Sequence, residues 1–136
     1  MRLILPAIAL AAILAAPALA AKVETPMTAA EFSAYATGKT LSYAQNGEVW
    51  GSEQYLPGQG VVWTFSGQEC QHGKWYADDD AICFVYETDP TPQCWHFFRE
   101  ANGLRAEFID DPVNTNLSEV SQSETPLTCP GPDVGA

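Results

Sequence analysis

Turn signals recur about every ten residues between Thr40 and Asp110, and this spacing constrains the fold more than any other feature of the chain. Between the signals apolar residues alternate with polar ones, as in GVVWTFS, where Val61, Trp63 and Phe65 share one face. No helical pattern interrupts the series, so the sequence predicts consecutive antiparallel strands rather than strand–helix–strand units. The turn signals are Asn46-Gly47, Pro57-Gly58, Ser66-Gly67, Asp78-Asp79-Asp80, Asp89-Pro90 and Asn102-Gly103.

These signals divide residues 40–110 into about seven strands of a mainly β fold. An antiparallel meander of that length tends to curl or close, because an open sheet edge invites mispairing. We therefore expect a strongly curled sheet or a small β-barrel. The predicted strands are residues 40–46, 48–56, 60–66, 72–77, 81–87, 93–100 and 103–110.

The segment before the strands predicts one short helix at about residues 29–37, or 28–37 with its N-cap. Thr28 and Glu31 have the spacing of a capping box, in which each side chain satisfies a backbone N–H at the helix start. Phe32 and Tyr35 fall on one helical face, and Gly38 is a natural terminator. We expect this aromatic face to pack on the sheet.

The last segment, residues 111–136, is rich in Ser, Thr, Asn, Pro and Asp. Such a composition is typical of an extended tail rather than of a packed element. Cys129 near its end indicates that the tail is tied back to the body of the protein.

The first 20 residues have the features of a cleaved signal peptide. Arg2 supplies the positive charge, an Ala- and Leu-rich apolar run follows, and Ala18-Leu19-Ala20 fits the small-x-small cleavage pattern. The run is short for a membrane span, which needs about 20 apolar residues, so an uncleaved anchor is the less favoured alternative. We expect cleavage after Ala20, a periplasmic or secreted protein of bacterial type, and a single domain over residues 21–136.

Four cysteines in a small exported domain indicate two disulfide bonds. In a hairpin of residues 81–87 and 93–100, Cys83 lies directly opposite Cys94, close enough to bridge, with a tight loop around Thr88-Asp89. Cys70 and Cys129 then pair by elimination, although four cysteines allow three connectivities.

The cysteines and the acidic residues could also be interpreted as metal ligands. Cys70 and Cys94 each precede a histidine by two positions, at His72 and His96, but this spacing matches no zinc finger, and exported cysteines usually oxidise. The acidic run at residues 78–80 could hold calcium with residues 110–111, yet it lacks the Gly and terminal Glu of an EF-hand and sits at a predicted turn. We expect no metal and no cofactor.

The charge of the chain excludes two classes of partner. The sequence has 6 basic and 17 acidic residues; Arg2 is the only charged residue before the predicted cleavage site, so the mature chain carries a formal net charge of −12. Nucleic acids and anionic membranes both need Lys and Arg contacts to phosphate, so we expect neither as a partner. The expected form is a soluble monomer.

Residues for catalysis are sparse. The chain has no Gly-x-Ser-x-Gly elbow and no phosphate loop, and its only histidines are His72, in a probable turn, and His96, among strand aromatics. We therefore expect no enzymatic activity and no catalytic residue.

Aromatic residues crowd the strands instead, and four tryptophans stand out. They form either a core of cross-strand aromatic pairs or, in part, the lining of a binding site. Adjacent aromatic pairs point to opposite faces of a strand, so the outward members need some cover. The candidate binding aromatics are Trp50, Trp63, Trp75 and Trp95.

At GKTLSYA, EQYLPG, CQHGKWY, ICFVYE and QCWHFF, over residues 28–110, the chain resembles a group of small exported bacterial proteins of unknown function. The shared pattern is a helix, Gly-Lys-Thr-Leu, a Gly-x-Trp, and a Cys-Phe…Cys-Trp hairpin, and the resemblance implies no particular activity. The segment from Gly73 to Trp75 is also similar to the Gly-x-Trp of calycin-like barrels such as lipocalins. Those barrels open their meander with the motif, whereas here it lies mid-chain.

Together these features predict an exported, non-enzymatic β-barrel-like module that binds a small ligand or a protein. The alternative is an acidic inhibitor of a cationic enzyme such as a lysozyme, and an unrecognised hydrolase is the third possibility. A closed barrel with an apolar cavity would favour ligand binding, and a filled barrel with an exposed acidic or aromatic loop would favour inhibition. A cleft holding His72 or His96 beside a carboxylate would favour an enzyme.

Overall fold

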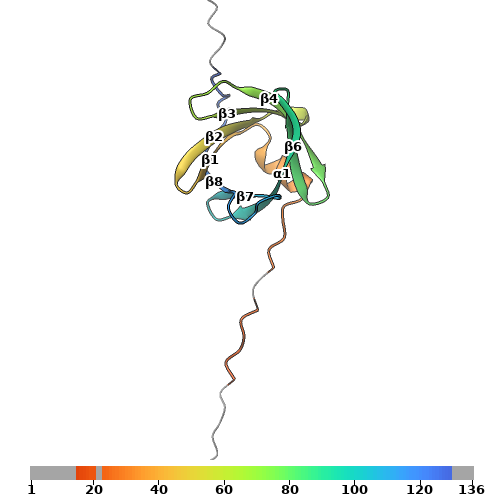
Figure 1. Ribbon diagram of the computed structural model, residues 1–136, viewed down its shortest axis with the longest axis vertical. Helices are drawn as coiled ribbons and strands as arrows, with labels where there is room; N and C mark the ends of the chain where they lie inside the picture. Colours follow the sequence, from red (N-terminus) through yellow and green to blue (C-terminus); the bar gives the residue numbers. More distant parts are fainter. Residues whose placement is uncertain (1–14, 21–22, 130–136) are drawn as a thin grey trace, which may run out of the picture.

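A computed structural model describes residues 15–20 and 23–129 of the 136-residue chain. In this part of the chain one α-helix precedes a closed antiparallel barrel, in which each strand pairs with the next and β8 pairs with β1 (Figure 1). The elements are α1 (Ala29–Ala36), β1 (Thr40–Gln45), β2 (Glu48–Tyr55), a 3₁₀ turn η1 (Pro57–Gln59), β3 (Gly60–Phe65), β4 (Gln71–Asp78), β5 (Ala81–Tyr86), β6 (Asp89–Glu100), β7 (Gly103–Phe108) and β8 (Asn116–Ser123).

The barrel confirms the predicted fold class, a mainly β antiparallel meander with one N-terminal helix. Strands β1, β2, β3, β5 and β7 fall within the ranges that the alternating sequence predicts. Strand β4 extends one residue beyond its range at each end, to Gln71 and Asp78, and β6 begins four residues early, at Asp89. The early start of β6 places Asp89 opposite Tyr86, so the tight turn spans Glu87 and Thr88 rather than Thr88-Asp89.

Strand β8 lies in the segment that the sequence assigns to an extended tail. It pairs with β7 and with β1, and these two ladders close the barrel. The pattern is hard to see in the sequence because only Leu117 places an apolar side chain in the core, while the next buried position is Glu119. Glu119 is satisfied by hydrogen bonds from the Tyr35 hydroxyl and the Leu104 backbone N–H, so a charged residue occupies an inward strand position.

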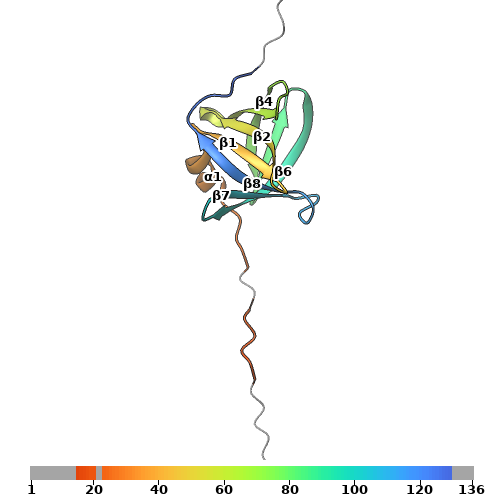
Figure 2. The same cartoon turned by 90° about the vertical axis from the view of Figure 1, so that its left-hand side faces the viewer.

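Helix α1 closes one end of the barrel. Figure 1 shows α1 inside the ring of strands, and the view turned by 90° in Figure 2 places it at one edge. The predicted capping box is present, with Thr28 N donating to the Glu31 carboxylate and Glu31 N donating to the Thr28 hydroxyl. Phe32 is fully buried and inserts among barrel aromatics. The helix therefore acts as a plug anchored at both its start and its aromatic face.

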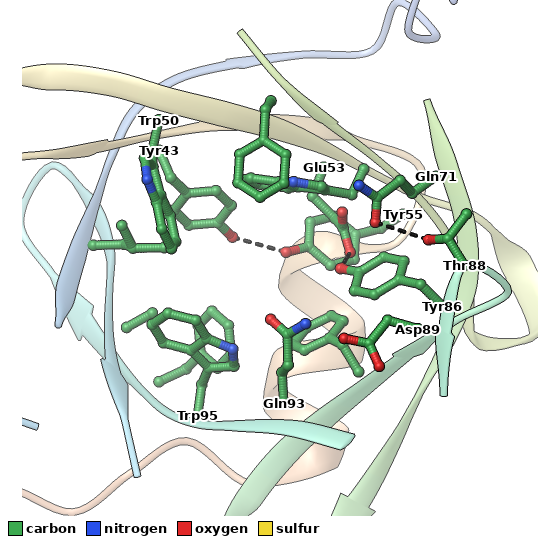
Figure 3. Close-up of a pocket in the computed structure, with 16 residues that line it drawn as sticks. Tyr43, Trp50, Glu53, Tyr55, Gln71, Tyr86, Thr88, Asp89, Gln93 and Trp95 are labelled. Carbon is green, nitrogen blue, oxygen red and sulfur yellow. Dashed lines mark hydrogen bonds between the residues drawn. The ribbon is translucent and has the colours of Figure 1, made fainter. Parts of the chain in front are cut away.

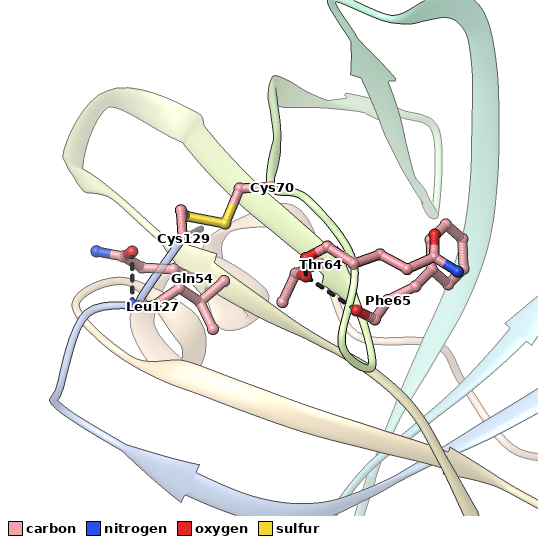
Figure 4. The surroundings of a disulfide bond; sticks show 7 residues. Gln54, Thr64, Phe65, Cys70, Leu127 and Cys129 are labelled. Atoms are coloured by element: carbon pink, nitrogen blue, oxygen red, sulfur yellow. Dashed lines mark hydrogen bonds between the residues drawn. A yellow bond between two sulfur atoms is a disulfide. The ribbon is translucent and has the colours of Figure 1, made fainter. Parts of the chain in front are cut away.

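Two disulfides fix the chain in the pairing expected from the sequence. Cys83 and Cys94 are directly opposed on β5 and β6, with their Cα atoms 4.0 Å apart. Cys129 pairs with Cys70 in the β3–β4 connection (Figure 4). Between β8 and Cys129 the chain crosses the outside of β1 and β2, where Leu127 N donates to the Gln54 side chain.

Parts of both ends of the chain lie outside the described residues. Most of the predicted signal peptide, residues 1–14, and the end of the predicted tail, residues 130–136, lie outside the described residues. The described residues contain no helix with the length and hydropathy of a membrane span. The two disulfides fit an oxidising, extracytoplasmic compartment.

Candidate functional site

The barrel interior contains a cavity of about 330 Å³ between the helix plug and the opposite end of the barrel. Side chains from all eight strands, together with Thr88 of the β5–β6 turn, line it (Figure 3). Strand β4 contributes Gln71, close to that turn. An eight-stranded barrel is just wide enough either to be filled by its own side chains or to hold one small ligand.

Aromatic rings form the floor of the cavity. Tyr55, Phe84 and Phe97 line it, and each of their rings packs against Phe32 of α1, with centroids 5.5, 6.4 and 4.6 Å away. Trp75 joins this cluster from β4 at 5.3 Å from Phe32. The helix thus seals this end with an edge-to-face aromatic cluster, a packing that adds to the burial of the rings.

Two strand glycines make room for aromatic side chains of the wall. A Cβ at Gly51 would overlap the Trp63 ring and the Thr64 carbonyl oxygen, and a Cβ at Gly73 would overlap the Tyr86 ring and the Val85 carbonyl oxygen. A glycine inside a strand commonly marks such a close approach. Because Gly51 and Gly73 have no side chain, the Trp63 and Tyr86 rings can lie close against the barrel wall.

A β-bulge directs Trp50 to the mouth of the cavity. Tyr43 pairs with Gly51 and Ala44 with Val49, so Trp50 is the extra residue on β2. A bulge re-aims the side chain of its strand, and the Trp50 ring meets those of Trp63 and Trp95 at centroid distances of 6.3 and 6.4 Å. Trp50 remains 37% exposed, as expected for a residue at an opening.

Polar side chains line the other side of this mouth. Asp89 and Gln93 of β6 line the cavity, and the Thr88 hydroxyl donates to the Gln71 side chain at 3.2 Å (Figure 3). Thr88 and Asp89 are exposed, whereas Gln93 is half-buried. The mouth is thus aromatic on one side and polar on the other.

Glu53 carries the most buried carboxyl group of the cavity lining. It is 2% exposed, lies on β2 directly opposite Leu41 of β1 and Trp63 of β3, and lines the cavity. The Tyr86 hydroxyl donates to its Oε1 at 2.9 Å. Among the described residues, Glu53 Oε2 is the buried side-chain oxygen or nitrogen that has no hydrogen-bond partner.

Burial controls the protonation of this carboxyl. Desolvation raises the pKa of Glu53 from its ordinary value of 4.5 to about 8, and the hydrogen bond from Tyr86 offsets this only in part. Below that pH Glu53 is mainly a neutral acid. Burial also raises the pKa values of the phenols of Tyr43, Tyr55 and Tyr86 well above 10, so they stay neutral.

A pair of phenols adds hydrogen-bonding capacity beside Glu53. The hydroxyl oxygens of Tyr43 and Tyr55 lie 2.9 Å apart, and one donates to the other. Both side chains line the cavity, so the phenol that does not donate within the pair keeps a proton available to a ligand. The site therefore combines aromatic walls with a small group of convergent polar atoms.

Three of the four tryptophans named from the sequence meet in this cavity. Trp50, Trp63 and Trp95 line it, whereas Trp75 belongs to the cluster around Phe32 at the closed end and is not part of the lining. The structure thus divides the four between the two interpretations that the sequence leaves open. Whether the three bind a ligand stays a prediction.

The two histidines lie outside the cavity lining. His96 Nε2 is 3.0 Å from Asp80 Oδ1, and both side chains are partly exposed on the outer side of the barrel. All four cysteines are in disulfides, so the thiolates that a Cys₂His₂ zinc site would need are not free. Within the described residues no group of three or more His, Cys, Asp and Glu side chains is placed to hold a metal ion.

Basic side chains cover two aromatic residues outside the cavity lining, Phe98 of β6 and Tyr35 of α1. The Arg105 guanidinium stacks 4.3 Å over the Phe98 ring, and Arg99 and Lys39 lie 4.2 and 4.3 Å from the Tyr35 ring. These cation–π contacts explain how Phe98 is buried on the outside of the barrel.

Sequence reasoning missed Glu53, the most informative residue of the site. With 17 acidic residues in the chain, none could be selected by type alone. One signal was available: in EVWGSEQY, Glu53 shares its strand face with Gly51 and Tyr55, the face that the alternation turns inward.

Comparisons of the chain with protein-family models, with curated proteins and with solved structures find no match. The function is therefore inferred from the geometry of the cavity.

Proposed function

We propose that this protein is an exported β-barrel that binds one small, largely apolar molecule in the cavity between its strands. Two features support the proposal: the barrel is closed, and its interior keeps about 330 Å³ free beside the aromatic walls. Ligand pockets in proteins are mostly apolar, span about 300–1,000 Å³ and contain a few placed polar groups. The cavity has each of these properties.

The observation that carries the proposal is the unpartnered Oε2 of Glu53. A buried polar atom without a hydrogen bond costs about 1–3 kcal/mol, and most such atoms in proteins have a partner. Here the atom belongs to a side chain that lines the cavity, beside the hydrogen-bonded phenols of Tyr43, Tyr55 and Tyr86. A ligand in the cavity would supply the missing partner.

Inhibition of a cationic enzyme remains the second candidate, since the acidic surface would attract such a partner. A surface inhibitor has no need of a cavity, and it leaves the placement of Trp50 at the mouth unexplained. We infer no enzymatic activity, because His72 and His96 lie away from the cavity and the convergent groups there include no nucleophile beside a base.

Export is part of the proposal. We propose that residues 1–20 are removed as a signal peptide and that the mature protein acts in the periplasm or outside the cell. The two disulfides support an oxidising compartment. Intact mass of the protein recovered from culture would show a chain that starts at Ala21; a chain that keeps residues 1–20 would contradict export by cleavage.

The binding proposal is tested by titrating the mature, oxidised protein with the neutral fluorescent dye N-phenyl-1-naphthylamine. The dye brightens in an apolar site, so a saturable rise with one site per protein is expected. A variant that fills the cavity, Ala106→Phe, provides the test of location, because Ala106 lines the cavity and is 1% exposed.

The matched control is Ser118→Phe, which adds a ring to the outer face of β8, next to Leu117 that pairs with Ala106. Thermal unfolding of each variant establishes that the barrel is folded. Loss of dye binding in folded Ala106→Phe but not in Ser118→Phe supports the cavity as the site. Absence of saturable binding to the unmodified protein, or equal binding to both variants, overturns the proposal.

A further inference from the structure

We propose that the cavity selects an apolar or aromatic molecule that carries a protonated amine, and that Glu53 is the counter-ion of that amine. This inference rests on the proposed binding function and adds the chemical class of the ligand. It is argued from the charge of the lining, from the aromatic walls and from the unpaired carboxyl oxygen.

The ionisable side chains that line the cavity, tyrosines aside, are both acidic. Glu53 lies in the wall and Asp89 at the mouth, and the lining includes no Lys, Arg or His. An anionic ligand would therefore enter a site without a cation to receive it, at a high cost in desolvation. A cation instead meets an acidic side chain at the mouth, Asp89, and at the wall a carboxyl that can ionise to pair with it, Glu53.

The walls are suited to a cation as well. The Trp50 ring lies between those of Trp63 and Trp95, which it meets at 6.3 and 6.4 Å, and Tyr43 and Tyr86 also line the cavity. The faces of such rings carry negative potential and attract an ammonium group within about 6 Å of the ring centroid. Sets of aromatic rings that surround a cation are a recurrent way to recognise substituted amines.

The geometry at Glu53 defines where the charged group would lie. Oε1 already accepts from Tyr86, so Oε2 is the free acceptor, and the Tyr43–Tyr55 pair of phenols lines the same cavity. An ammonium group has three N–H donors and no acceptor. It can satisfy Oε2 and a phenol oxygen at once, which a single hydroxyl donor cannot do.

Long-range charge acts in the same direction. The predicted mature chain carries a formal net charge of −12, because Arg2 is the only charged residue before the cleavage site. A field of this sign concentrates cations at a mouth lined by a carboxylate and speeds their association.

Binding of an amine would be coupled to loss of a proton from Glu53. The titratable groups that line the cavity with Glu53 are the phenols of Tyr43, Tyr55 and Tyr86, whose pKa values are raised by burial, and Asp89 at the mouth. Burial raises the pKa of Glu53 to about 8, so below this pH the carboxyl must ionise to pair with the amine. The affinity for an amine should then rise about tenfold per pH unit from pH 6 to pH 8 and level off above it.

Isothermal titration calorimetry on the mature, oxidised protein tests the inference with two probes of the same skeleton. These are 2-phenylethylamine, whose ammonium stays charged to about pH 9 as a lysine does, and the neutral 2-phenylethanol. At pH 8 the amine is expected to bind at least about tenfold more tightly than the alcohol, as for a buried charge pair. Repeating the titration in buffers of different ionisation enthalpy measures the proton released on binding.

Two variants separate the role of Glu53 from a general effect of charge. Glu53→Gln keeps an oxygen that accepts from Tyr86 but cannot ionise, whereas Asp78→Asn removes one negative charge from an exposed position at the end of β4, outside the cavity lining. The preference for the amine and the proton release should vanish in Glu53→Gln and persist in Asp78→Asn. Dye binding by Glu53→Gln shows that its cavity is intact.

The outcomes distinguish this inference from the proposed function. Equal affinity for amine and alcohol, or a preference for the amine that survives in Glu53→Gln, overturns the amine inference while dye binding upholds the binding cavity. Affinity for the amine that falls as pH rises from 6 to 8 also overturns it. If neither the dye nor either probe binds, the proposed function itself is wrong.

Discussion

The Tyr86 hydroxyl reaches from β5 to donate a hydrogen bond to Glu53 on β2, 2.9 Å away across the barrel interior. The two strands are not neighbours in the sheet, so the contact exists only because the barrel is closed. It satisfies one carboxyl oxygen and leaves the other without a hydrogen-bond partner in the protein. The tyrosine thereby fixes the position of an ionisable group in the cavity lining.

The buried carboxyl predicts an unusual dependence of stability on pH. Because the pKa of Glu53 is about 8 in the folded protein and 4.5 ordinarily, the folded state binds one proton more between these values. The contribution of Glu53 to the free energy of unfolding is therefore largest below pH 4.5. It falls by on the order of 4 kcal/mol as the pH rises to 8. Urea denaturation of the protein and of Glu53→Gln across this range should show Glu53→Gln gaining relative stability by that amount.

The difference in the free energy of unfolding between the two proteins isolates Glu53, because the other carboxylates titrate in both and their effects cancel. A difference that stays constant from pH 4.5 to pH 8 would mean that Glu53 ionises normally in the folded state.

Removal of the Tyr86 hydroxyl should cost stability without changing the shape of the wall. In Tyr86→Phe both oxygens of Glu53 lack a partner, so we expect a loss of about 1–3 kcal/mol in the free energy of unfolding. The pKa of Glu53 should rise further, because the hydrogen bond from Tyr86 lowers it. The carboxyl chemical shift of Glu53, followed by NMR against pH, measures this directly.

The control for that variant is Tyr76→Phe, since Tyr76 lies on β4 with its side chain 40% exposed. It should leave both stability and the titration of Glu53 unchanged. Equal losses in the two variants would indicate a general effect of removing a phenol.

Gly51 should tolerate no side chain. In Gly51→Ala the new methyl group overlaps the Trp63 ring. Such overpacking typically lowers the free energy of unfolding by about 1–3 kcal/mol. Gly60→Ala is the matched control on the neighbouring strand β3, because a Cβ there meets Leu56 at an ordinary distance of 3.4 Å. Chemical denaturation should separate the two variants, and tryptophan fluorescence should report a displaced Trp63 in Gly51→Ala alone. Equal stability of the two would show that Trp63 does not depend on this glycine.

The elements that could be predicted from the sequence are those with local signals. Each of these signals lies within a short stretch of sequence. They are the capping box of Thr28 and Glu31, the alternation in β3, and the register that places Cys83 opposite Cys94. Even there, the register holds only as far as Phe84, because an irregularity in β6 places Tyr86 opposite Asp89.

The rest depends on contacts between residues far apart in the chain. Strand β8 carries Glu119 at an inward position because Tyr35, 84 residues away, supplies the hydrogen bonds that bury it. Trp50 would face outward by strict alternation, and only the bulge against β1 brings it to the cavity. Glu53 gains its altered pKa from closure of the barrel, which no local pattern describes.

The two disulfides should differ in how much they stabilise the protein. The Cys70–Cys129 bond closes a separation of 59 residues and Cys83–Cys94 one of 11, so loop entropy predicts losses of roughly 4 and 3 kcal/mol when each pair is changed to alanine. Urea denaturation of the two double variants measures the order. The account of the tail as a tied segment is contradicted if removing the Cys70–Cys129 bond costs nothing.

The most direct test of amine binding in the cavity is a crystal structure of the protein soaked with 2-phenylethylamine at pH 8. The account predicts density for the ring among Trp50, Trp63 and Trp95, with the amine nitrogen about 2.8 Å from Glu53 Oε2 as in charge-assisted hydrogen bonds. An empty cavity at saturating amine, or an amine bound only on the outer surface of the barrel, would contradict it.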